Sequence, residues 1–146
     1  MTDVLRVQDL RVRYDTPSGS VRAVEGVSFS LKKGERLGLV GESGSGKSTT
    51  VLSLLRMLKP PARIEAGKVL LDGVDLLTLS EAEMRAARFA RIALIPQGAM
   101  NSLNPVMRIK HQLMDTIQYH NGKFSKSELA IKIQKLLESV GLDKTV

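Results

Sequence analysis

Residues 41–49 read GESGSGKST, and this stretch decides the fold class. The spacing Gly41-x4-Gly46-Lys47-Ser48 fits the phosphate-binding loop pattern. An apolar run at 37–40 precedes it, and apolar residues at helical spacing follow it. This is the strand, loop and helix order that the pattern requires, and it disfavours the alternative of a flexible Gly/Ser linker. The stretch therefore predicts an α/β protein.

Each residue type in the loop has a chemical reason. Glycines let successive backbone N–H groups point inward and leave room for phosphate oxygens. The helix that should start near Gly46 adds its free N–H groups and the positive end of its dipole. Lys47 can reach the outer phosphates, and the Ser48 hydroxyl is a ligand type that Mg²⁺ prefers. The loop alone identifies neither the nucleotide nor the reaction.

Composition narrows the class of protein. The 146 residues are 42% hydrophobic and 25% charged, as in one soluble globular domain. The absence of cysteine excludes disulfides, and two distant histidines do not favour a zinc site. The net charge of +7 permits a polyanionic partner. Because the basic residues are dispersed and aromatics are only 3%, we expect no nucleic-acid partner.

The first half of the chain has strand and helix signals in alternation. Apolar–polar alternation predicts a strand pair or one long bent strand over 4–14 and a half-buried strand over 27–31. The apolar run at 37–40 predicts a buried parallel strand. Helical spacing of apolar residues predicts a helix over 50–58, which Pro60-Pro61 ends.

The second half has clear turn and cap signals. KVLL at 68–71, followed by Asp72-Gly73, predicts a hairpin. The apolar run at 92–95 predicts a second buried strand, and a helix is expected over 106–119. Capping-box pairs predict two helix starts: Ser80 with Glu83, and Ser125 with Glu128. One apolar face is expected on the last helix: Leu129, Ile133, Leu136, Leu137 and Val140.

Three longer stretches carry a family resemblance. They read RAVEGVSFSLKKGERLGLVGESGSGKST at 22–49, GKVLLDGVDLL at 67–77 and IALIPQGAMNSLNPVM at 92–107. With them the chain resembles the amino-terminal part of the ATP-binding subunit of an ABC transporter, in the subfamily of oligopeptide, dipeptide and nickel importers. SLNPV after the glutamine points to the peptide-importer branch. The resemblance covers essentially the whole chain.

The resemblance implies the architecture. The fold would be a P-loop NTPase core of the ABC ATPase type, α/β, with an antiparallel β portion and the start of a helical subdomain. Residues 1–100 would form the β portion and the P-loop core, and residues 101–146 the start of a truncated helical subdomain. The chain would then be an amino-terminal fragment of a longer subunit.

The resemblance also assigns roles to residues. Tyr14 would stack on adenine, with packing on a sheet as the alternative. Lys47 and Gln97 would be catalytic, and Ser48 and Gln97 would bind Mg²⁺. Gln97 would also relay the nucleotide state to membrane subunits. The implied cofactors are ATP and Mg²⁺, and the residues that would bind ATP are Tyr14, Gly41, Glu42, Ser43, Gly44, Ser45, Gly46, Lys47, Ser48 and Thr49.

The implied function is ATP binding and, in the full-length protein, ATP hydrolysis that powers an importer of peptides. The implied partners are transmembrane permease subunits and a second ATPase subunit. The implied location is cytoplasmic, peripheral on the inner face of the cell membrane.

The chain departs from the family pattern in several places. Gly98-Ala99 follow Gln97, where the family often has an acidic residue and proline. The family's Ser-Gly-Gly signature, its apolar strand ending in Asp-Glu and its switch histidine do not occur. The stretch most similar to that strand is VLLD at 69–72, but Gly73 follows it where the glutamate would be. We interpret this stretch as part of a hairpin rather than as a Mg²⁺ site at Asp72 or Asp75. We therefore expect ATP binding without turnover, and self-association through the open flank of the strand at 37–40.

Other functional classes remain open on the sequence. A small GTPase is excluded because no Asn-Lys-x-Asp string occurs. A stand-alone nucleotide-binding regulatory module would be distinguished by the coding sequence after Val146. A small-molecule P-loop kinase would show substrate-dependent phosphoryl transfer, but the chain has no arginine-rich lid. A basic interaction protein would show salt-sensitive DNA binding.

Overall fold

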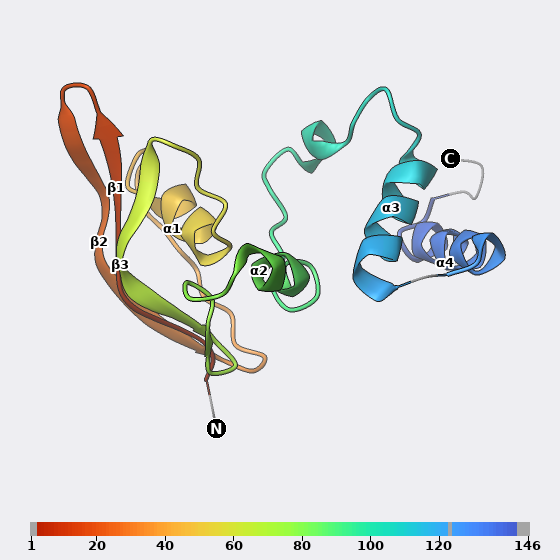
Figure 1. The fold of residues 1–146 in the computed structure, drawn as a ribbon, viewed down its shortest axis with the longest axis horizontal. Helices are drawn as coiled ribbons and strands as arrows, with labels where there is room; N and C mark the ends of the chain where they lie inside the picture. The colour runs from red at the N-terminus through yellow and green to blue at the C-terminus, as the bar shows by residue number, and fades with distance from the viewer. Residues whose placement is uncertain (1–2, 123, 143–146) are drawn as a thin grey trace. The chain divides into compact units, whose positions relative to one another are not determined.

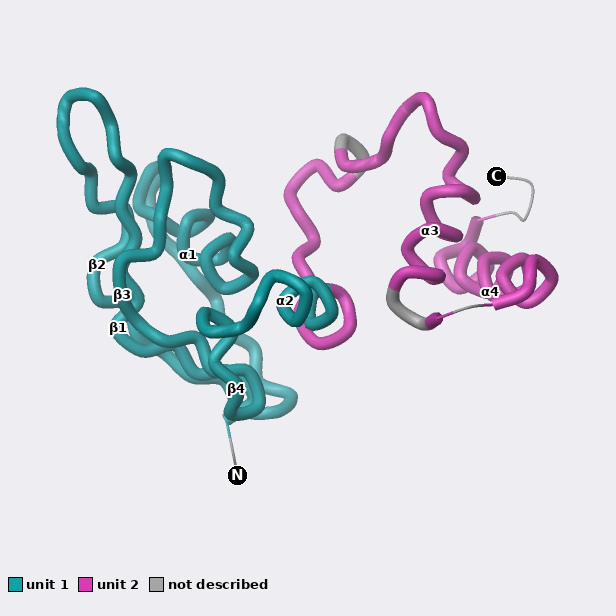
Figure 2. The backbone as a smooth tube through the Cα atoms, in the orientation of Figure 1, with its two compact units in different colours: residues 1–88 teal, residues 89–146 magenta. Residues whose placement is uncertain are grey.

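The computed structural model describes residues 3–122 and 124–142. These form two compact units, residues 1–88 and residues 89–146 (Figure 2). The boundary predicted between residues 100 and 101 stays a prediction. Along the chain the elements are β1 (Asp3–Thr16), β2 (Gly19–Lys32), α1 (Lys47–Leu54), β3 (Ala62–Leu71), β4 (Val74–Asp75), α2 (Glu81–Ala87), the 3-10 helix η1 (Ala99–Ser102), α3 (Ile109–Asn121) and α4 (Lys126–Ser139) (Figure 1).

The first unit is built on an antiparallel sheet with the order β2-β1-β3-β4. β1 is one long strand, as the sequence allowed, and its register is irregular around Asp9, which has a φ of 45°. The apolar residues change phase there, from Leu5 and Val7 to Leu10 and Val12. All four side chains are nevertheless buried. The irregularity restores the inward face that a strict two-residue period would lose.

α1 packs against β1 and β2 (Figure 1). The helix predicted over 50–58 starts three residues earlier and ends at Leu54. Its end is a Schellman motif, because Met57 N–H donates to Leu52 O at 2.9 Å and Arg56 N–H donates to Ser53 O at 3.0 Å. Arg56 has the left-handed φ of 50° that this motif requires. The apolar spacing up to Leu58 therefore overestimated the length of the helix.

The hairpin and both capping boxes are confirmed. Leu71 pairs with Val74 across the turn, where Asp72 and Gly73 have φ values of 47° and 82°. These angles match the mirror-image turn that Asp-Gly favours. At the starts of α2 and α4 a serine side chain accepts from the backbone N–H three residues on, and the glutamate at that position binds back to the serine N–H.

The two predicted buried strands are not present. Residues 37–40 are irregular, and residues 93–95 are irregular after a single bridge at Ile92. Val40 is 92% exposed and Ile95 is 88% exposed. A parallel strand requires hydrogen-bonding neighbours on its flanks. Within residues 3–122 and 124–142, β1 to β4 pair only with one another, so neither run has a strand beside it.

The second unit has its core between α3 and α4. Ile117 is buried with Leu129, Ile133 and Leu137, and partly buried Leu113, Met114 and Phe124 pack against them. The apolar face predicted for the last helix is thus confirmed at its centre, whereas Leu136 and Val140 are exposed at its edge. The helix predicted over 106–119 begins at Ile109. No described helix is long and apolar enough to cross a membrane.

Candidate functional site

The glycine loop runs directly into α1 and is positioned by β2. Gly46 is the N-cap of α1, with a left-handed φ of 89°. A Cβ atom on Gly46 would lie 2.3 Å from the carbonyl oxygen of Ala23 in β2. A Cβ atom on Gly41 would lie 2.7 Å from Ser45 Oγ and 3.9 Å from Lys47 Nζ. A side chain at Gly46 would therefore displace the loop from β2, and a side chain at Gly41 would fill the inner side of the loop.

Lys47 folds back over the loop. Its Nζ donates to the carbonyl oxygens of Gly41 at 2.7 Å and Glu42 at 2.6 Å, and to Ser45 Oγ at 3.2 Å. These three bonds match the three donors of an ammonium group. The sequence puts Lys47 at the first position of α1, so the turn of the loop brings its cation to the inner side of residues 41–46.

The start of α1 is suited to an anion. Gly46 has no side chain to cap the first N–H groups, and the first turn contains no acidic residue. The starts of α2 and α4 differ, because their capping-box glutamates, Glu83 and Glu128, occupy that position. Hydrogen bonds from the serine hydroxyl and backbone N–H lower the pKa of both glutamates. At α1 the N–H groups and the helix dipole add to the charge of Lys47.

Tyr14 lies next to the first turn of α1. It is on β1, paired with Val21 of β2 and Ala62 of β3. Its hydroxyl is 3.4 Å from Thr49 Oγ1, and both side chains are partly buried. The structure thus brings together two predicted site residues that are far apart in sequence.

The remaining predicted residues are at the surface. Glu42, Ser43 and Ser45 are exposed in the loop, and Ser48 is exposed on α1. Gln97 is exposed in a turn of the second unit, and the structure places it only within that unit.

The turn that contains Gln97 uses the glycine that departs from the family pattern. Gly98 has a left-handed φ of 71°, a conformation that glycine adopts without strain. Gly98 therefore suits the conformation that the chain has directly after Gln97.

Asp75 is part of the hairpin. Its Oδ1 accepts from the backbone N–H groups of Val69 at 3.2 Å and Leu77 at 3.1 Å. Asp72 lies in the turn itself. Among the described residues, no group of three or more His, Asp or Glu side chains could hold a metal ion. The hairpin interpretation of this stretch is confirmed.

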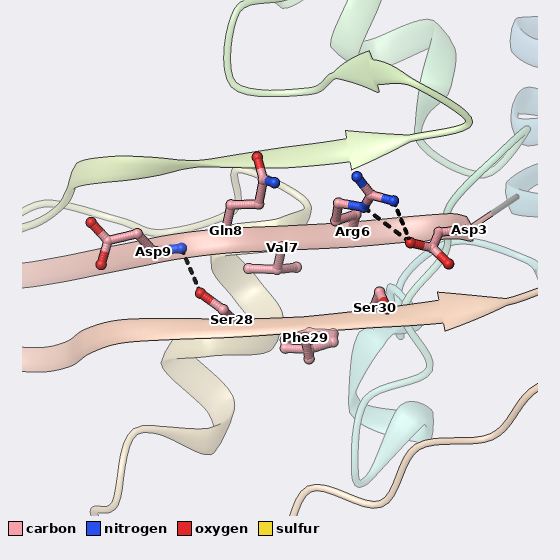
Figure 3. A pocket seen from close by; sticks show the side chains of 8 residues that line it. All are labelled: Asp3, Arg6, Val7, Gln8, Asp9, Ser28, Phe29 and Ser30. Carbon is pink, nitrogen blue, oxygen red and sulfur yellow. Dashed lines mark hydrogen bonds and ion pairs between the residues drawn. The ribbon is translucent and has the colours of Figure 1, made fainter.

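A shallow hollow of about 600 Å³ lies on β1 and β2 and is lined by residues 3, 6–9 and 28–30 (Figure 3). Its one arginine, Arg6, donates to Asp3 Oδ2 at 2.8 Å and 3.0 Å. Asp9 adds a second carboxylate to the lining. Because carboxylates outnumber cations there, the hollow is unsuited to phosphate.

Two features of the site gave no local sequence signal. One is the carbonyl of Ala23, which limits Gly46 to glycine. The other is Arg88, whose side chain binds the carbonyl end of α1. Both contacts join residues more than twenty positions apart, so periodicity and motif spacing could not reveal them.

Comparison with known proteins gives close relatives in sequence. The family model described as ABC transporter matches residues 24–146. The chain is 41% identical over 143 residues to the dipeptide transport ATP-binding protein DppD of Caldanaerobacter subterraneus subsp. tengcongensis, covering 98% of this chain and 44% of that protein. It is 43% identical over 137 residues to the oligopeptide transport ATP-binding protein OppD of Escherichia coli, covering 94% and 40%. The chain thus spans less than half the length of these relatives.

Solved structures show the same fold at low identity. The dimeric structure of MJ0796, a bacterial ABC transporter cassette, matches with a TM-score of 0.70 and 20% identity, over 92% of this chain and 57% of that one. A post-hydrolysis state of the ATP-binding cassette MJ0796 bound to ADP and Pi matches with a TM-score of 0.75 and 19% identity, over 95% and 58%. The fold class predicted from the sequence, an ABC ATPase type of α/β fold, is confirmed.

Proposed function

The chain belongs to the ABC transporter family, and we propose that residues 41–49 bind the phosphates of Mg·ATP. The observation that carries this proposal is the position of Lys47 Nζ, 2.7 Å and 2.6 Å from two carbonyl oxygens on the inner side of the loop. Phosphate oxygens would be stronger acceptors for the same donors, because their negative charge adds Coulomb attraction to the ammonium group, which neutral carbonyl oxygens do not provide. The uncapped start of α1 supports the same ligand.

Mg²⁺ would be held through the Ser48 hydroxyl, and Gln97 would join it in the assembled site. Ser48 is exposed at the second position of α1, directly after Lys47, and hydroxyl and amide oxygens are ligands that suit Mg²⁺. The ion would supply charge neutralisation between the outer phosphates. Lys47 would hold the outer phosphates at the same time. The residues of the loop thus fit a Mg·triphosphate.

Tyr14 would provide the contact to the base. Its position beside Thr49 places an aromatic ring next to the helix that starts at the loop. A ring face there would stack on adenine and add to the affinity set by the phosphates.

For the whole protein we propose an ATPase that powers the import of peptides. The names of DppD and OppD support the substrate class, since both are ATP-binding proteins of peptide transport. The proposed partners are permease subunits at the inner face of the membrane and a second ATPase subunit. Gln97 would relay the nucleotide state to the permease. Residues 1–100 would then carry nucleotide binding, and residues 101–146 would begin the helical subdomain.

Calorimetric titration with Mg·ATP tests the proposal. Lys47→Ala removes charge-assisted bonds worth about 1.5–3 kcal/mol each, so affinity should fall at least tenfold. Lys33→Ala is the matched control, because Lys33 is an exposed lysine in the turn after β2. It should bind as the wild type does. Equal affinity of the wild type and Lys47→Ala would refute the assignment.

A further inference from the structure

Arg88 binds the end of α1 that lies opposite the glycine loop. Its Nε donates to the carbonyl oxygen of Leu55 at 2.9 Å, and its Nη2 donates to that of Arg56 at 3.1 Å. These carbonyls belong to the cap and turn that end α1. A cation is also favoured there by the helix dipole. Arg88 therefore fixes the far end of the helix that begins with Lys47.

Arg56 makes the reciprocal contact. Its Nη1 donates to the carbonyl oxygens of Leu79 at 2.6 Å and Leu76 at 3.4 Å, just before α2. Glu81, the first residue of α2, accepts from Arg88 Nη1 at 2.8 Å and lies 3.8 Å from Arg56 Nη2. We call Arg56, Glu81 and Arg88 the clasp. Both arginine side chains are mostly buried, at 26% and 21% exposure.

The clasp lies directly before the segment that carries Gln97. Arg88 ends the first compact unit, and Phe89 begins the second. Phe89 has a left-handed φ of 67°, and its N–H donates to the carbonyl oxygen of Ile92 at 2.8 Å. Only this tight turn separates the clasp from residues 92–98.

We propose that Arg88 is a positioning residue that couples the phosphate-binding end of α1 to residues 92–98. The inference rests on the proposed function, because it requires nucleotide at Lys47. α1 has 8 residues and is about 12 Å long, so a displacement of its first turn upon phosphate binding would also displace its last turn. Arg88 transmits that displacement to the turn at Phe89. A lysine could not do so, because a point charge lacks the planar fork that spans two carbonyls and a carboxylate.

Amide hydrogen exchange of the whole chain, with and without Mg·ATP, tests this coupling. In the wild type and in Gln97→Ala, which removes the proposed contact of Gln97 with Mg²⁺, exchange should slow in residues 41–49 and change in residues 92–98. In the Gln97→Ala background, Arg88→Ala should keep the first response and lose the second. Arg85→Ala is the matched control, because it removes the same charge from an exposed position on α2, and it should keep both responses. Arg88→Lys retains the charge, should also lose the second response, and decides the test if Arg88→Ala does not fold.

The outcomes separate the coupling from nucleotide binding. A response at 92–98 that persists in both Arg88 variants overturns the coupling, as does its loss in Arg85→Ala. Protection of 41–49 in the wild type with no response at 92–98 overturns the coupling and leaves the proposed function intact. Absence of protection at 41–49 in the wild type overturns the proposed function itself.

Discussion

Gly44→Ala and Gly46→Ala form a matched pair that tests how the loop is positioned. Both glycines have left-handed φ values, 81° and 89°. A Cβ atom on Gly44 would meet nothing within 4 Å, whereas one on Gly46 would lie 2.3 Å from Ala23 O. The left-handed conformation costs an alanine about 1–2 kcal/mol at either position. The steric conflict at Gly46 should add about 1–3 kcal/mol, as in overpacked cores.

We therefore expect Gly44→Ala to lower the free energy of unfolding by about 1–2 kcal/mol and Gly46→Ala by about 2–5 kcal/mol. Urea unfolding followed by circular dichroism measures both, provided that the m-value is unchanged. Gly46→Ala should also lose more affinity for Mg·ATP, because relief of the conflict moves the start of α1 away from β2. Equal losses of stability in the two variants would refute the contact between Gly46 and Ala23.

Three further predictions concern the base, the capping boxes and the chemistry. Tyr14→Ala should weaken ATP binding about two- to tenfold but leave inorganic triphosphate binding unchanged in calorimetry; equal weakening of both would contradict stacking. The hydrogen bonds from Ser125 lower the pKa of Glu128 in the folded state. The Glu128 carboxylate therefore stabilises the folded state fully above the unfolded-state pKa of about 4.3, and this stabilisation is lost as the pH falls through the lower folded-state pKa. Glu128→Gln keeps the box without titrating and should flatten the acid limb of a stability–pH curve measured by circular dichroism; an identical limb would exclude this role. Residues 1–146 by themselves should release no phosphate in multiple turnovers, because their sequence contains no glutamate base after an apolar strand. Positioned proton transfer by such a base typically accelerates a reaction about 10²–10⁴-fold. Turnover that disappears in Lys47→Ala would contradict this prediction.

Features that depend only on residues close together in the sequence were predictable from it. The turn at Asp72-Gly73 and the two capping boxes depend on residues within three positions of one another, and the structure has all of them. The loop at 41–49 is equally local, and it leads into α1 as predicted. Local backbone chemistry is sufficient to specify these features.

Features that depend on distant partners were not predictable in this way. The apolar runs at 37–40 and 92–95 suit buried strands, but a strand also requires neighbours that its own residues do not encode. The bonds from Arg88 to the end of α1 and the contact of Gly46 with Ala23 likewise arise only after folding. The family resemblance assigned Tyr14 and Thr49 to one binding site, but no local pattern indicated the contact between their side chains.

The most direct test of the central claim is to locate bound nucleotide by amide hydrogen exchange at single-residue resolution. Upon addition of Mg·ATP, the largest decrease in exchange rate relative to the ligand-free protein should occur in residues 43–49, where the loop and the first turn of α1 present their N–H groups. Lys47→Ala should abolish that protection at the same ligand concentration. Protection centred on the hollow formed by residues 3, 6–9 and 28–30, or protection of the loop that is unchanged in Lys47→Ala, would contradict the account.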